Sequence, residues 1–181
     1  MAGKDTEFFS NRANCYGYAA KCADPLNGEG GGQARPGGAT PQSNAAAYLA
    51  ALQQGVLADA GTRARQIGQF SVAALSSDQI PVPAAGWYLV AMLTHDTGFH
   101  FVRRQLSRFA GDPFWKWKQG NPGMVERNAF EPDAKRYVRV TNANFPKLIR
   151  GGMVTEAPGY TGWQTVTFFE VHPAGFTVSA G

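Results

Sequence analysis

The sequence predicts an α+β fold in which helices come first and an antiparallel sheet follows. Apolar residues in the first half recur at the spacing of a helix, whereas the second half holds apolar and aromatic runs separated by tight turns. Pro81 and Pro83 lie between the two halves and end the helical part. The 181 residues suit a single domain spanning 1–181, with 1–10 expected to be flexible.

Three stretches in the first half are predicted as helices. They cover about residues 13–21, 44–59 and 62–75, of which the third has the weakest pattern. Asn11 or Asn14 suits the cap of the first helix, and Ser43 suits the cap of the second. Between these helices, the glycine- and proline-rich residues 24–41 predict a long loop. Loops of this length inside a domain are often functional.

Five stretches in the second half are predicted as strands. They cover about residues 86–94, 99–106, 114–118, 137–141 and 164–172. The Asp-Thr-Gly sequence at 96–98 predicts a tight turn, so the first two strands should form a hairpin. Side chains alternate along a strand, which places His100 and Val102 on one face and Phe99 and Phe101 on the other.

The charge balance is mildly basic, because 17 Lys and Arg residues against 13 Asp and Glu residues give a net charge of +4. These basic residues are scattered and form no stripe, so no nucleic-acid partner is expected. The longest apolar run, at 87–93, is too short to span a bilayer, so no membrane partner is expected. The polar N-terminus lacks the apolar stretch of a signal peptide. We expect synthesis in the cytoplasm and, if the protein is secreted, a route that needs no signal peptide.

Neither a disulfide nor a cofactor is expected. On one helix the Cα atoms of Cys15 and Cys22 would be ~10 Å apart, and a disulfide needs less than ~7 Å. The two cysteines and three histidines show no zinc-site spacing. The loop at 24–41 lacks the Gly-Lys-Ser/Thr ending of a nucleotide-binding loop.

Cys15 and His100 are the strongest candidates for catalysis. Cys15 opens the first predicted helix, where the positive end of the helix dipole favours the reactive thiolate. A cysteine early on a helix and a histidine on a later strand follow the order of a papain-like thiol enzyme. We therefore expect Cys15 to be the nucleophile and His100 its base. The alternatives are a purely structural His100, or His95 in the turn as the base.

Other polar residues could complete such a site. A third group must accept from the ring N–H of the histidine, and Asn128 and Gln119 are the leading candidates. The backbone N–H of Cys15, with the side chain of Asn11 or Asn14, could stabilise an oxyanion. A plain helix cap is an equally good interpretation of Asn14.

Three tryptophans are candidates for substrate binding. Trp115 and Trp117 share one face of a predicted strand. Trp163 follows a loop that contains glycine and proline, and is expected to line the substrate cleft. The alternative is ordinary packing of aromatic side chains, which needs no function.

The run Asn14-Cys15-Tyr16-x-Tyr18-Ala19 resembles the NCYxYA start of a group of small bacterial and phage-associated proteins of the papain-like cysteine peptidase and amidase superfamily. Four later segments are similar to that group in the same order. They are Leu52–Asp59, Gly86–Ala91, Phe99–Arg103 and Trp115–Gly120. The resemblance implies a papain-like fold with Cys15 as nucleophile and His100 as base. The chain departs from the group at Trp117, where relatives often carry a histidine.

These observations predict a hydrolase that cleaves an amide bond in a peptide, a protein or peptidoglycan through a thioester on Cys15. The resemblance implies a secreted effector toxin with a cognate immunity protein as its partner. Deamidation or transglutaminase-like transfer would use the same acyl-enzyme. A non-enzymatic component of a phage or secretion particle, with an inert Cys15, is the alternative from another class.

Overall fold

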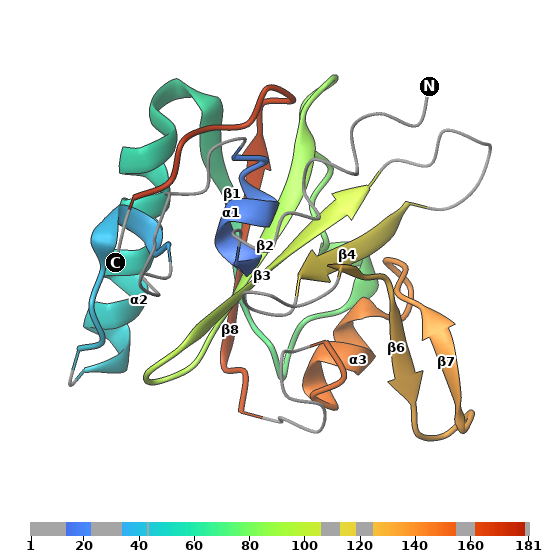
Figure 1. Ribbon diagram of the computed structural model, residues 1–181. Coiled ribbons are helices and arrows are strands. Elements are labelled where there is room, and N and C mark those ends of the chain that lie inside the picture. Colours follow the sequence, from blue (N-terminus) through green and yellow to red (C-terminus); the bar gives the residue numbers. More distant parts are fainter. Residues whose placement is uncertain are drawn as a thin grey trace.

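A central antiparallel sheet organises the structure (Figure 1). The computed structural model describes residues 14–22, 34–42, 44–105, 113–118, 125–154 and 162–179. The strands of the central sheet are β1 (Ala64–Ser71), β2 (Tyr88–Thr94), β3 (Phe99–Gln105), β4 (Phe114–Lys118), β5 (Val125–Glu126) and β8 (Thr165–Val171). Their order across the sheet is β1-β8-β2-β3-β4-β5. A second sheet pairs β6 (Asn128–Glu131) with β7 (Arg136–Arg139).

Helices lie on both faces of the central sheet. The α-helices are α1 (Cys15–Ala19), α2 (Ala45–Ala60) and α3 (Phe145–Arg150). Short 3₁₀ turns are η2 (Pro36–Gly38), η3 (Gly61–Arg63) and η4 (Ser77–Gln79). Figure 1 shows α1 lying over the central strands, in contact with β3, and α3 beside the β6–β7 hairpin. No helix in the described ranges combines the length and apolarity that crossing a bilayer requires.

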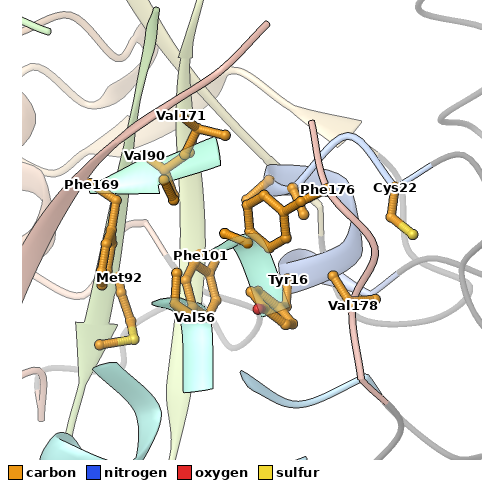
Figure 2. Close-up of a cluster of buried hydrophobic side chains, with 14 of the residues drawn as sticks. Tyr16, Cys22, Val56, Val90, Met92, Phe101, Phe169, Val171, Phe176 and Val178 are labelled. Carbon is orange, nitrogen blue, oxygen red and sulfur yellow. The ribbon is translucent and has the colours of Figure 1, made fainter. Parts of the chain in front are cut away.

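The two faces of the sheet bury separate hydrophobic clusters. On the α1 face, strand residues that include Val90, Phe101 and Phe169 pack against α1, α2 and the C-terminal segment. Figure 2 shows Phe101 between the strand side chains and Tyr16 of α1, with Phe176 beside it. On the α3 face, the intervening strand residues pack against α3. They include Leu89, Leu93, Val102, Trp115 and Trp117.

The α+β class and several predicted elements are confirmed. The β2–β3 hairpin pairs Thr94 with Phe99, as expected from the turn between them. Strands β4, β7 and β8 and helix α2 lie where the sequence predicts them, within one or two residues. The first helix is shorter than predicted. Elements α3, β5 and β6 are not predicted by the sequence.

The predicted helix at 62–75 is wrong, because β1 occupies most of this range. Gly61, with a φ of 55°, follows the last residue of α2, and the chain then turns into an extended conformation. β1 is an edge strand that pairs with β8 alone. Its polar residues, such as Gln66 and Gln69, suit an edge but hide the alternation of a strand. The cap of α2 also differs from the prediction, since the Asn44 side chain accepts from the N–H groups of Ala46 and Ala47.

Candidate functional site

Asn14 fixes the start of α1 and thereby the place of Cys15. Its Oδ1 accepts from the N–H of Gly17 at 3.1 Å, which is a helix cap. Its Nδ2 donates to the carbonyl oxygen of Ala34 at 2.7 Å. The same amide therefore joins α1 to the segment that leads into η2. This geometry confirms Asn14 as a cap, the structural interpretation of this residue.

Three contacts hold α1 on its face of the sheet. The ring of Tyr16 lies 4.8 Å from that of Phe101, between centroids. The Arg103 guanidinium donates to the carbonyl oxygen of Tyr18 at 3.2 Å. The Tyr88 hydroxyl donates to the carbonyl oxygen of Ala19 at 2.9 Å. Cys15, at the start of this short helix, is thus held above the end of β3 nearest the β2–β3 turn.

Arg35 reaches the site because η2 lies directly on α2. A Cβ atom on Gly55 of α2 would collide with the backbone of Pro36, so only glycine allows this approach. Gly37 has a φ of 56°, a conformation that also favours glycine. The N–H of Arg35 donates to the carbonyl oxygen of Ser179 at 3.2 Å. These contacts bring the Arg35 side chain next to Tyr48 of α2.

Asp59 links the segments that surround Cys15. Its carboxylate accepts from the Tyr16 hydroxyl at 2.8 Å, from the N–H of Gly37 at 3.1 Å and from the N–H of Ser179 at 3.2 Å. Burial raises the pKa of the Tyr16 hydroxyl, and the Asp59 carboxylate adds to this rise, so Tyr16 stays a donor. An acidic residue at the end of a helix opposes the helix dipole, and that is the sequence signal that could have indicated a partner for Asp59.

Cys15 opens onto a small polar pocket of about 130 Å³, which we call the Cys15 pocket. Its walls are Asn14, Cys15, Arg35, Tyr48 and residues 97–99 of the β2–β3 turn. Cys15 is 3% exposed and Tyr48 is 1% exposed. The Tyr48 hydroxyl lies beside the Arg35 guanidinium, and no group among the described residues accepts its proton. Burial raises its pKa, and the nearby Arg35 guanidinium only partly offsets this rise.

The structure does not bring His100 to Cys15. His100 lies on the α3 face of β3, and its ring stacks on that of Trp163 with centroids 6.1 Å apart. The neighbouring strand residues, Phe99 and Phe101, point to the α1 face, where Cys15 lies. Because side chains alternate along a strand, one sheet separates the two residues. The expected Cys15–His100 dyad is therefore absent from this arrangement.

The other two histidines also lie outside the Cys15 pocket. The ring of His95 packs against Gly98 and, at 5.3 Å between centroids, against Trp163. Burial lowers the pKa of His95, and Asp96 opposes this shift. His172 lies beyond β8 and packs edge-on against Trp87. No histidine lines the pocket, and all three belong to the described part of the chain.

The remaining predicted site residues lie elsewhere. Trp115 stacks on Phe145 of α3 at 4.3 Å, and its Nε1 donates to Asn142 at 3.0 Å. Trp117 and Trp163 belong to the same buried cluster, so all three candidate tryptophans are core residues of the α3 face.

Asn128 is exposed on β6, in the second sheet. Asn11 and Gln119 lie outside the described residues. Cys22 lies beyond the end of α1 in the core of the α1 face, and neither cysteine is in a disulfide. Among the residues that the structure describes, no group of acidic, histidine and cysteine side chains could hold a metal ion.

Sequence reasoning missed Arg35 and Tyr48. Arg35 lies in the stretch that the sequence predicts as a long loop, and the helical spacing of Tyr48 with Leu52 and Val56 indicates only an apolar core face. The one available signal was the Arg-Pro pair at 35 and 36, since proline at the first position of a helical turn predicts a defined conformation there.

Comparisons of the chain with protein-family models, with curated proteins and with solved structures found no match. The papain-like resemblance therefore stays a prediction.

Proposed function

We propose that the protein catalyses thiol-dependent acyl transfer in the Cys15 pocket, most simply the hydrolysis of an amide bond. One observation carries the proposal. A thiol, a guanidinium and a buried hydroxyl whose proton no described residue accepts line the same small polar pocket. Buried polar groups in proteins are almost always hydrogen-bonded, and the Tyr48 O–H is available to donate to a ligand in the pocket.

The chemistry needs only the substrate and water. The Cys15 sulfur bonds to the carbonyl carbon, the bond from carbon to the leaving nitrogen breaks, and the thiol proton passes to the departing amine. Water then attacks the thioester, which releases the carboxylic acid and restores the thiol. Deamidation follows the same two steps with ammonia as the leaving group, and transfer follows them with an amine in place of water.

A papain-like layout is part of this proposal. The helix that bears Cys15 precedes the antiparallel sheet on which it packs, as in that layout. The partner of the thiol differs, because the pocket contains Arg35 and no histidine. A guanidinium near a thiol attracts its negatively charged, reactive form, so Arg35 takes over the electrostatic part of the role that histidine has in papain-like enzymes.

The second candidate is a protein that binds a small ligand without turning it over. The near-complete burial of Cys15, at 3% exposure, together with the lack of a histidine in the pocket, favours this function. In that case the Cys15 thiol only packs against the ligand. The two candidates differ in whether a covalent acyl group ever forms on Cys15.

The test uses 4-nitrophenyl acetate, an activated acyl donor that reports each acylation by releasing nitrophenol. We expect a burst of nitrophenol equal to the protein concentration, with an acetyl group on Cys15 in the intact mass and peptide map. Cys15→Ser should abolish the burst. Cys22→Ser is the matched control, because Cys22 is also buried but does not line the pocket, and it should retain the burst. A burst that survives Cys15→Ser contradicts the proposal, as does a wild-type protein that shows none.

A further inference from the structure

The charge of Arg35 is not neutralised within the described part of the chain. None of the ion pairs there involves Arg35. Asp59 is the acidic residue that joins the segments around the pocket, but its carboxylate already accepts from Tyr16, Gly37 and Ser179. Asp59 also lies outside the walls of the Cys15 pocket. A half-buried guanidinium therefore faces the pocket, and no described residue places an anion opposite it.

Tyr48 adds a neutral donor beside this cation. Its hydroxyl is buried, lines the pocket beside Arg35, and has no acceptor for its proton among the described residues. Because burial raises its pKa, the hydroxyl keeps its proton at neutral pH. A guanidinium and an O–H donor side by side match the two oxygens of a carboxylate, which accepts from both.

The size of the pocket limits what can enter it. An engineered apolar cavity of roughly 150 Å³ takes up a benzene molecule of six carbon atoms. The Cys15 pocket, at about 130 Å³, therefore has room for a group of about five or six non-hydrogen atoms. That is enough for a carboxylate, one or two carbons and an acyl carbon at the thiol.

We propose that the Cys15 pocket binds a carboxylate between Arg35 and Tyr48, so that its substrates are acyl compounds with a carboxylate one or two carbons from the carbon that Cys15 attacks. Acidic side chains and chain-terminal carboxylates in peptides belong to this class. A neutral amide of the same shape is a poorer ligand, because it leaves the guanidinium without a counter-charge. The assignment of this substrate class rests on the proposed acyl transfer, whereas the carboxylate-binding site does not.

The first experiment measures binding without the thiol. In Cys15→Ser protein, NMR titrations compare propionate with propionamide, two ligands with five non-hydrogen atoms each. We expect propionate to bind more tightly, on the order of tenfold. Arg35→Gln should remove the preference. Arg136→Gln, which changes an exposed arginine on β7, should leave it intact.

Tyr48→Phe separates a ligand-binding hydroxyl from a structural one. Removing a buried hydroxyl whose proton no described residue accepts should leave the denaturation midpoint unchanged or raise it, whereas propionate affinity should fall severalfold. A hydroxyl that stabilises the fold would instead lower the midpoint and leave the affinity unchanged. That result, or equal binding of propionate and propionamide, overturns the inference.

The second experiment uses the thiol of the wild-type protein. Iodoacetate carries a carboxylate where iodoacetamide carries a neutral amide of similar shape, so the ratio of their rates at Cys15, divided by the ratio for the uncharged thiol 2-mercaptoethanol, reports attraction of the carboxylate. We expect a corrected ratio above about five, which falls to one in Arg35→Gln. If the acetyl burst fails but propionate binding and this ratio persist, the acyl transfer is disproved and the carboxylate site is retained. If the burst occurs and the corrected ratio is one, the carboxylate site is disproved and the acyl transfer is retained.

Discussion

On the α1 face of the sheet, polar side chains connect separate segments of the chain, whereas on the α3 face aromatic rings fill the core. Asn14 and Asp59 together bond to α1, to the segment around η2 and to the C-terminal residues. The α3 face instead stacks Trp115 on Phe145 and His100 on Trp163. Both faces bury a hydrophobic cluster, and the α1 face, which we call the polar face, also carries the Cys15 pocket, whereas stacked rings dominate the α3 face, which we call the aromatic face. Candidate chemistry therefore belongs to the face where polar groups converge, although the aromatic face carries the histidine that the sequence favours.

The largest expected effect comes from damage to the aromatic face. Trp115→Ala removes a fully buried indole and its stacking on Phe145, so the free energy of unfolding should fall by about 3–5 kcal/mol. Urea denaturation measures this loss. Trp115→Phe keeps an aromatic ring in place and should cost less. In either variant that still folds, propionate binding should stay within twofold of wild type, and a larger change would mean that the two faces are coupled.

A smaller but more specific effect is expected at the contact between η2 and α2. Gly55→Ala places a methyl group against the backbone of Pro36, so the turn that carries Arg35 has to move. The free energy of unfolding should fall by about 2 kcal/mol, and propionate affinity should fall with it. Gln54→Ala, on the exposed side of the same helix, is the control for changes in helix propensity. Full retention of propionate affinity in Gly55→Ala would show that the η2 contact does not position Arg35.

Moving a histidine to the other face should create the missing dyad. Phe99 lines the Cys15 pocket, so Phe99→His places an imidazole on the same face as the thiol. A nearby general base should raise the rate of acetylation by 4-nitrophenyl acetate by on the order of tenfold, with a rise between pH 6 and 7.5 as the imidazole loses its proton. Phe99→Leu is the control for the lost ring. Equal acetylation rates in Phe99→His and Phe99→Leu would show that an imidazole at this position does not act as a base for Cys15.

The smallest effect is expected from the native histidine. His100→Gln alters a side chain on the α3 face, and the rate of Cys15 alkylation by iodoacetamide should change by less than about twofold. A Cys–His dyad would require a loss of at least about a hundredfold. Measuring the rate by mass spectrometry of the Cys15 peptide therefore distinguishes the two arrangements directly. A hundredfold loss of the alkylation rate in a folded variant would show that His100 reaches Cys15 in solution.

Local patterns along the sequence predict much of the fold. The β2–β3 hairpin follows from two apolar runs around an Asp-Thr-Gly turn, and α2 follows from its apolar spacing. β1 does not, because its partner β8 lies about a hundred residues later and its exposed edge carries polar side chains. Pairing with a remote strand overrides the weak local preference of residues 62–75.

In the candidate site, too, features that depend on neighbouring residues are predictable, and features that depend on remote contacts are not. The cap at Asn14 and the helix start at Cys15 depend on neighbouring residues, and the structure confirms both of these places in the helix. Alternation correctly separates His100 from Phe101, but nothing in a single strand tells which of its faces will meet the helix. Arg35 and Tyr48 come together only because two glycines allow η2 to lie on α2, a contact between segments that local patterns do not link.

The Asp59 carboxylate has a consequence for how the molecule opens. Its partners Gly37, Tyr16 and Ser179 lie 22, 43 and 120 residues away along the chain. One group thus closes three loops, so a movement that displaces the Asp59 carboxylate breaks its bonds to all three segments at once. In hydrogen exchange, the amides of Gly37 and Ser179 should open in a single cooperative unit at a common rate. A small molecule that fills the Cys15 pocket would then slow exchange in the C-terminal segment, which it never touches.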